Sequence, residues 1–150
     1  MSEKGKLPPT AHRVAWNTSG KTNAEIRRKA MRHVEKAIAE GDLDGAIRRL
    51  DREWDTERVL ETNAACLLLL SLGLGVTRDR RWLWLTGGVA AFLLQHALQG
   101  WCPPLPLIRT LGVRTAEEIS AERIALKSLR GDFTNLVQDP ECVIRTAELE

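Results

Sequence analysis

The order of charged and apolar positions divides the chain into polar flanks and an apolar centre. Residues 62–77 and 82–108 contain no Lys, Arg, Asp or Glu, although 28% of the chain is charged. In both stretches apolar side chains occupy every side of a helix, as in 66–70 and 92–94, whereas a helix on the surface of a soluble protein has one apolar stripe. Residues 78–81 between them are charged. The pattern therefore predicts two helices, apolar on all sides, joined by a short turn into an antiparallel hairpin.

The N-terminal flank has the period of amphipathic helices. Residues 22–25 read Thr-Asn-Ala-Glu, a capping box, and apolar residues then recur every three or four positions until Gly41, a helix stop signal. Asp42 or Asp44 can cap a second helix. Its apolar stripe comprises Leu43, Ile47, Leu50 and Trp54. The expected element is a helical hairpin over 22–57, preceded by a flexible arm over 1–21.

The C-terminal flank predicts one more amphipathic helix. Residues 115–118 form a second capping box, and the helix should end at Gly131. We expect this helix to lie on the N-terminal hairpin or on a membrane surface, followed by a loosely docked tail within 115–150. The predicted fold is all-α, with a two-helix transmembrane hairpin over 58–114 between amphipathic flanks.

A membrane is the environment that the central helices fit best. About 20 helical residues cross a hydrocarbon core near 30 Å, and the amphipathic flanks can cover only one face of each central helix. A lipid bilayer or an oligomer must cover the rest. Four tryptophans lie at the ends of the apolar segments, as in the aromatic belts of membrane proteins. They are Trp54, Trp82, Trp84 and Trp101.

The arginines predict an orientation. Six lie just outside the hairpin and three lie in the turn, which favours a cytoplasmic location for both termini. The outer arginines are Arg48, Arg49, Arg52, Arg58, Arg109 and Arg114, and those of the turn are Arg78, Arg80 and Arg81.

Small and polar residues within the two spans suggest how the helices pack. Ser71 with Gly75, and Gly87 with Ala91, are spaced i,i+4 and allow close approach of helices within the hairpin and in a homodimer. The polar residues of the second span are Gln95, His96 and Gln99. Such groups are costly in lipid, so they are candidates for a relay or a small polar ligand. Hydrogen bonds between helices, or proximity to the interface, are the commoner explanation.

Composition argues against several other classes. The apolar fraction of 43% is too high and too clustered for a disordered chain, and a net charge of +2 is too small for a charge-driven nucleic-acid binder. Cys66, Cys102 and Cys142 are too few and too widely spaced for a disulfide framework or a CxxC-type zinc site. No cofactor, metal site or catalytic constellation is predicted. The bases of the N-terminal hairpin are interleaved with acids, as on a solvated face, although they could also bind anionic headgroups or a protein partner.

The segment Leu-Gln-Gly-Trp-Cys-Pro-Pro, ending the second span, resembles the YgaP-like transmembrane hairpin family of bacterial inner-membrane proteins. The resemblance covers about residues 58–114 and rests on Gly100, Cys102 and Pro103, with Arg58 before the first span and Trp82 or Trp84 opening the second. It implies a hairpin in the inner membrane, often dimeric, without an assigned biochemical role. Some members anchor a rhodanese domain, but no α/β repeat is present here, so sulfurtransferase activity is not expected.

Three functions remain open on the sequence alone. The first is a small inner-membrane protein with an anchoring, scaffolding or small-solute role and no evident catalysis. The second is a soluble, oligomeric all-α interaction module that buries 62–108. The third is a thiol-dependent sulfur or redox carrier centred on Cys102, whose proline neighbour and position at the membrane surface would suit a reactive thiol. A structural role at the helix end is the commoner explanation for such a cysteine.

Overall fold

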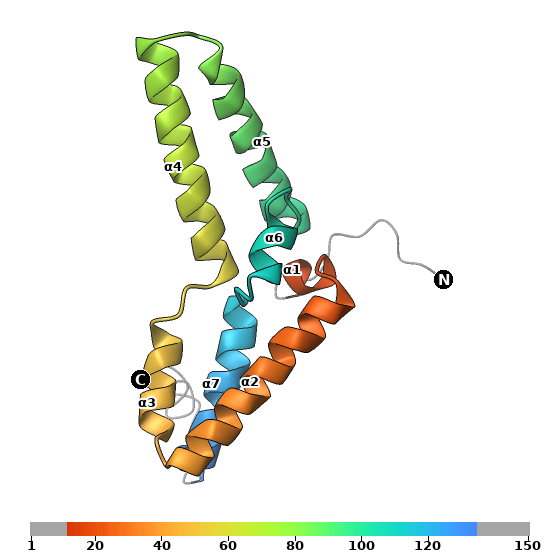
Figure 1. The fold of residues 1–150 in the computed structure, drawn as a ribbon, viewed down its shortest axis with the longest axis vertical. Coiled ribbons are helices and arrows are strands. Elements are labelled where there is room, and N and C mark those ends of the chain that lie inside the picture. The colour runs from red at the N-terminus through yellow and green to blue at the C-terminus, as the bar shows by residue number, and fades with distance from the viewer. Residues whose placement is uncertain (1–11, 135–150) are drawn as a thin grey trace, which may run out of the picture. The chain divides into compact units, whose positions relative to one another are not determined.

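The computed structural model describes residues 12–134, which form helices and no strand, and this confirms the all-α class (Figure 1). The elements are α1 (Arg13–Trp16), α2 (Gly20–Glu40), α3 (Leu43–Asp51), α4 (Thr56–Thr77), α5 (Trp82–Gln99), α6 (Leu105–Thr110) and α7 (Ala116–Arg130). They divide into two compact units. The hairpin unit comprises 12–23 and 54–115, and the three-helix unit comprises 24–53 and 116–134 among the described residues.

Helices α4 and α5 form the antiparallel hairpin of the first unit (Figure 1). The Asp55 side chain caps α4 by accepting a hydrogen bond from the Arg58 amide at 2.7 Å. Near the turn the two helices are in direct contact. The Ser71 and Thr86 hydroxyls lie 2.8 Å apart, and a Cβ on Gly75 would lie 2.6 Å from the Leu83 side chain. By contrast, Gly87 and Ala91 are exposed and do not take part in this contact.

The open end of the hairpin has its own apolar core, which includes the short helix α1. Val14 is buried there with Leu60, Cys102, Leu105 and Ile108. Residues 12–21 therefore differ from the extended arm that the sequence predicted. The physical reason is that the Val14 side chain is buried in an apolar site between α4 and α6. The remainder of the predicted arm, 1–11, lies outside the described residues.

A buried arginine fixes the segment that follows α1. Arg109 of α6 is 1% exposed and donates hydrogen bonds to the Thr18 hydroxyl at 3.1 Å and to the Asn23 side-chain oxygen at 3.0 Å. A buried guanidinium is costly unless its donors are satisfied. These bonds hold residues 18–23 against α6.

The three-helix unit consists of α2, α3 and α7 around a small apolar core. Its buried members are Ala37, Ala46, Ile47, Leu50, Ile119 and Leu126. As predicted, α2 ends before Gly41, which has a φ of 68°, and Asp42 caps α3 by accepting from the Gly45 amide. Ile119 and Leu126 belong to α7, so the C-terminal helix packs on the N-terminal helices. This is the first of the two predicted placements, on the N-terminal hairpin and not on a membrane surface.

Two local predictions in this flank were wrong. Helix α2 begins at Gly20, and the hydroxyl of Ser19, not Thr22, accepts an amide hydrogen bond of the first turn. Helix α3 ends at Asp51, so Trp54 does not continue its stripe; the indole is 47% exposed and lies under the Arg58 guanidinium, 4.5 Å from the ring centroid. The tail predicted after Phe133 lies almost wholly outside the described residues, as does Cys142.

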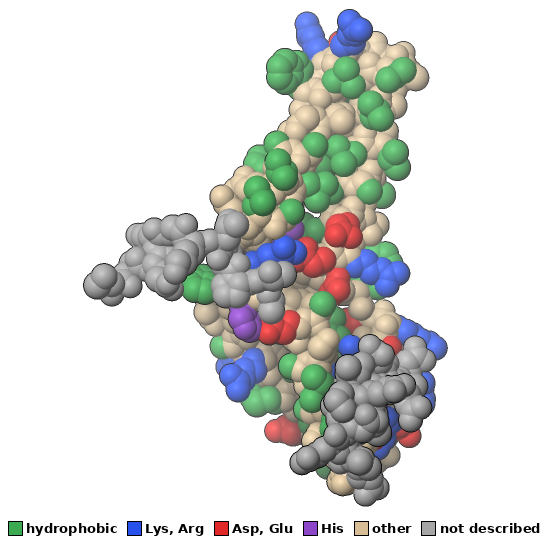
Figure 2. All heavy atoms as spheres, turned by 180° about the vertical axis from the view of Figure 1, so that it is seen from behind, with side chains coloured by type: hydrophobic (Ala, Val, Ile, Leu, Met, Phe, Trp, Pro, Cys, Tyr) green, Lys and Arg blue, Asp and Glu red, His purple; other side chains and the backbone are tan. Residues whose placement is uncertain are grey.

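The hairpin exposes much of its apolar surface. Figure 2 shows hydrophobic side chains along both helices and basic side chains at the turn. Among them Leu69 is 72%, Val76 77% and Trp84 85% exposed. By length and hydropathy, one helical stretch within the described residues, Leu43–Thr77, qualifies as a candidate membrane span; it contains α4.

Candidate functional site

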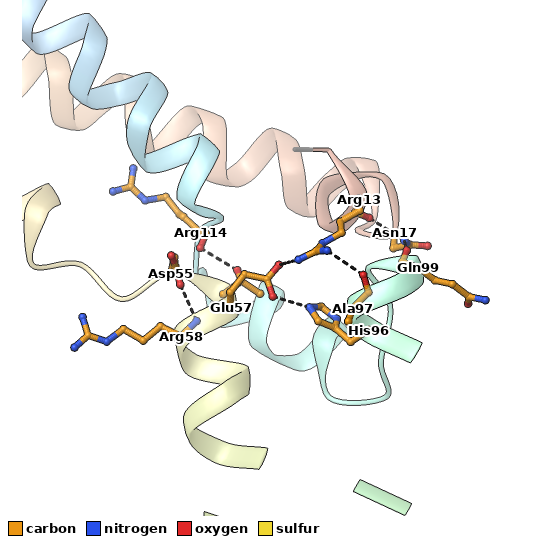
Figure 3. Close-up of polar contacts among 10 residues, drawn as sticks. Arg13, Asn17, Asp55, Glu57, Arg58, His96, Ala97, Gln99 and Arg114 are labelled. Carbon is orange, nitrogen blue, oxygen red and sulfur yellow. Dashed lines mark hydrogen bonds and ion pairs between the residues drawn. The ribbon is translucent and has the colours of Figure 1, made fainter. Parts of the chain in front are cut away.

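Three charged or ionisable side chains meet at the open end of the hairpin. Glu57 lies in the first turn of α4, ahead of the charge-free stretch 62–77, and His96 lies in the last turn of α5. The Glu57 Oε2 is 2.9 Å from the His96 Nε2, and the Arg13 Nη2 donates to the Glu57 Oε1 at 3.0 Å (Figure 3). One carboxylate thus joins α1, α4 and α5.

The same cluster ties α1 to the end of α5. The Arg13 Nη1 donates to the Ala97 carbonyl at 3.0 Å, and the Asn17 side chain donates to the Gln99 carbonyl at 2.8 Å (Figure 3). These carbonyls lie in the last turn of α5, where the helix supplies no amide partner. Gly100 makes the approach possible, because a Cβ there would lie 2.6 Å from the Arg13 Cβ, and its φ of 71° suits glycine.

The electrostatics of the cluster favour an ionised carboxylate. The pKa of Glu57 is lowered, chiefly by the hydrogen bond from His96 and with help from Arg13, although burial opposes the shift. An ionised carboxylate can only accept hydrogen bonds, so the His96 Nε2 must carry the shared proton. The other ring nitrogen, Nδ1, is buried and makes no hydrogen bond to the described residues. His96 itself is 4% exposed.

Cys102 lies in the apolar core beside this cluster and is 3% exposed. Burial raises the pKa of its thiol, and the negative charge of Glu57 raises it further. Reactive cysteines need the reverse, a lowered pKa in an accessible, electropositive site. The surroundings of Cys102 therefore favour a structural thiol over a sulfur or redox carrier. Cys66, by contrast, is exposed on α4, and both thiols are free.

A cavity of about 370 Å³ opens between α4, α5 and α6, next to the cluster. Most of its lining is apolar, and its polar members are Asn63, His96 and Cys102. The apolar members are Leu60, Ala64, Leu67, Val89, Phe92, Leu93, Pro104, Leu107 and Ile108. The size falls within the range of about 300–1,000 Å³ that is usual for small-molecule sites.

The residues singled out from the sequence are only partly brought together. His96, Cys102 and Gly100 lie at the open end of the hairpin, while Gln95 is half-buried and the Gln99 side chain is exposed. Pro103 is exposed and precedes α6. Ser71 and Gly75 lie in the contact with α5 near the turn, away from the cluster.

Sequence reasoning missed Arg13 and Glu57, the two partners that complete the cluster. Arg13 belonged to the arm to which no structure was assigned. Glu57 had a usable signal, because a carboxylate at the start of one helix and a histidine at the end of its antiparallel neighbour lie at the same end of the hairpin. A simple count of helical rise obscured the pairing, since it places Glu57 about 30 Å and His96 about 21 Å from the turn.

Comparison with known proteins gives one match. Residues 55–118 match the family described as inner membrane protein YgaP-like, transmembrane domain. No curated protein and no solved structure matches the chain. The match covers α4, α5 and α6 together with the first residues of α7. It thus contains Glu57, His96 and Cys102, whereas Arg13 and α1 lie outside it.

The match and the exposed apolar surface of the hairpin agree: the chain is a membrane protein, and its residues 55–118 are similar to the transmembrane domain of the YgaP-like family.

Proposed function

We propose that this chain is a membrane-anchored scaffold, in which the α4–α5 hairpin crosses the bilayer twice and holds the three-helix unit at the membrane surface. The observation that carries the proposal is the apolar exterior of the hairpin. Leu69, Val76 and Trp84 project outward from α4 and α5 and are more than 70% exposed. Exposure of so much apolar surface to water is unfavourable by about 25 cal/mol per Å². Lipid removes that cost.

The dimensions of the hairpin support two crossings. At about 1.5 Å per residue, α4 is about 33 Å long and α5 about 27 Å, close to the thickness of a hydrocarbon core. The polar residues of α5, Gln95, His96 and Gln99, all lie near its end. The contact with Glu57 pairs one ring nitrogen of His96, which reduces the cost of placing α5 in a membrane.

The family description and the arginine count support an inner-membrane location with both termini in the cytoplasm. The exposed small residues Gly87 and Ala91 on α5 support a homodimer, because they leave a smooth surface for a second copy. In this arrangement the three-helix unit is the part that a cytoplasmic protein partner could bind. The alternative, a soluble oligomer that buries the same surface, predicts the opposite fractionation.

Membrane extraction of matched variants tests the proposal. We expect the chain expressed in bacteria to stay in the membrane pellet after alkaline carbonate and to dissolve in detergent. Leu69→Arg places a charge on the outward face of α4, at a cost of about 3 kcal/mol by insertion scales, and should reduce the retained fraction. The control, Ala125→Arg, changes an exposed position of α7 and should leave retention unchanged. Release of the unmodified chain by carbonate would establish the soluble oligomer instead.

A further inference from the structure

The cavity between α4, α5 and α6 is graded in polarity along the hairpin. All three polar members of its lining, His96, Cys102 and Asn63, lie at the open end, beside apolar residues such as Leu60 and Ile108. Towards the turn it is lined by Leu67 of α4 and Val89 of α5. Val89 lies seven positions before His96 on α5, about 10 Å along the helix axis. The polar groups of the lining are thus confined to one end, and over that length the lining becomes wholly apolar.

The distribution of polar and apolar lining matches the two parts of a membrane lipid, a polar head and an apolar tail. In a hairpin that crosses the membrane, the open end lies at the interface and the middle of the helices lies among acyl chains. The apolar part of the cavity is also continuous with the outer surface of the hairpin, where Leu67 and Phe92 are 46% and 47% exposed. An occupant can therefore enter sideways from the lipid without crossing water.

We propose that the cavity binds one acyl chain of a membrane phospholipid, with the tail between α4 and α5 and the ester region at the His96 end. The inference rests on the proposed membrane function and adds a specific ligand class to it. The lining offers the acyl chain contacts from three helices, whereas the outer face of a single helix offers contacts from one. Such a site retains its lipid when bulk lipid is exchanged for detergent.

Two matched pairs of variants isolate the cavity from the rest of the hairpin surface. Ala64 lines the cavity, and its neighbour Ala65 is exposed and lies outside the lining. Ala64→Phe therefore fills the cavity, while Ala65→Phe adds the same ring to the outer face. A second pair repeats the comparison. Val89→Phe fills the cavity from α5, whereas Val76→Phe adds the same ring to an exposed position on α4 near the turn.

The measurement is native mass spectrometry of the full chain, purified in mild detergent and incubated with palmitoyl-oleoyl phosphatidylethanolamine. We expect one retained lipid per chain, with at least a fivefold smaller bound fraction in Ala64→Phe and no change in Ala65→Phe. A thermal unfolding midpoint checks that each variant is folded. If Ala64→Phe does not fold, the Val89→Phe and Val76→Phe pair provides the same comparison.

Three results would overturn the proposal. No retained lipid in the unmodified chain would mean an empty groove, and equal retention in Ala64→Phe and Ala65→Phe would place the lipid elsewhere. A lipid-free dimer that Ala64→Phe dissociates would identify a second copy as the occupant. Carbonate extraction of the same preparations separates this inference from the proposed function. A chain that stays in the membrane without retained lipid refutes the lipid site alone, whereas a chain released by carbonate refutes both.

Discussion

Glu57 is the residue on which the open end of the hairpin depends. Its two carboxylate oxygens bind different partners, His96 of α5 and Arg13 of α1, so one side chain links three segments. Glu57→Gln keeps the size and one acceptor oxygen but removes the charge. Hydrogen bonds to charged groups contribute about 1.5–3 kcal/mol each. Because the Glu57 side chain is 32% exposed, solvent screens part of this, and we expect a loss of about 1–2 kcal/mol.

Denaturant titration of the full chain in detergent micelles measures that loss. The matched control is Glu61→Gln, one turn along α4 at an exposed position, where we expect a change within about 0.5 kcal/mol. Equal stabilities for the two variants would show that the Glu57 pairs contribute nothing to the fold.

The same carboxylate predicts a pH dependence. The pKa of Glu57 in the folded chain lies below its usual value of 4.5, mainly because of the hydrogen bond from His96. A lowered pKa means that the unfolded chain binds the proton more tightly, so the stabilisation is complete above about pH 4.5 and is lost as the pH falls through the folded pKa. Unfolding of the unmodified chain and of Glu57→Gln should therefore differ most near neutral pH and converge in acid. A stability difference that stays constant down to about pH 3 would contradict this.

At the scale of elements, the contact between α4 and α5 depends on a missing side chain. A Cβ on Gly75 would lie 2.6 Å from the Leu83 Cδ2 and 3.4 Å from the Leu83 backbone nitrogen, whereas one on Gly73 would meet nothing within 4 Å. Gly75→Leu should force the helices apart near the turn and cost about 1–3 kcal/mol. Gly73→Leu makes the same chemical change on the outer face and should not destabilise the hairpin. Thermal unfolding midpoints of both variants in micelles test the pair, and a smaller effect at Gly75 than at Gly73 would refute the packing.

Elements were predictable from sequence where a local signal determined them. The charge-free stretches placed α4 and α5, and Gly41, Asp42 and Gly131 placed the ends of helices in the flanks. The prediction that Trp54 belongs to the apolar stripe of α3 was wrong, because its spacing fits the stripe but the helix ends three residues earlier.

The candidate site was less predictable, because its members depend on tertiary contacts. Helix α1 has only four residues, too few to be stable without packing, and nothing local to the sequence reveals that Val14 finds a buried place. His96 was identified as an exception within an apolar segment, but its partner Glu57 is 39 positions away. The pairing depends on how the two helices pack, which composition does not encode.

For the whole molecule, the number of crossings decides where the three-helix unit lies. If α4 and α5 both cross, the segments before α4 and after α5 emerge on the same side. If α4 alone crossed, α7 would lie on the opposite side from α3, which would separate two helices that share the core of the three-helix unit. Two exposed positions report on the topology: Ser128 on α7 distinguishes these arrangements, and Asp79 in the turn reports the orientation of the hairpin. When the N-terminus is cytoplasmic, Asp79 should face the periplasm in both arrangements. Only Ser128 changes sides.

We expect two crossings with cytoplasmic termini, and single-cysteine labelling tests this directly. In a background with Cys66, Cys102 and Cys142 replaced by Ser, Asp79→Cys should react with a membrane-impermeant maleimide in intact cells. Ser128→Cys should react only after the cells are opened, because α7 follows the second crossing. Labelling of both variants in intact cells would mean that α4 crosses alone. The reverse pattern, Ser128→Cys in intact cells and Asp79→Cys only in opened ones, would keep both crossings but invert the hairpin. The three arginines of the turn would then outweigh the six that flank the spans, contrary to the positive-inside rule.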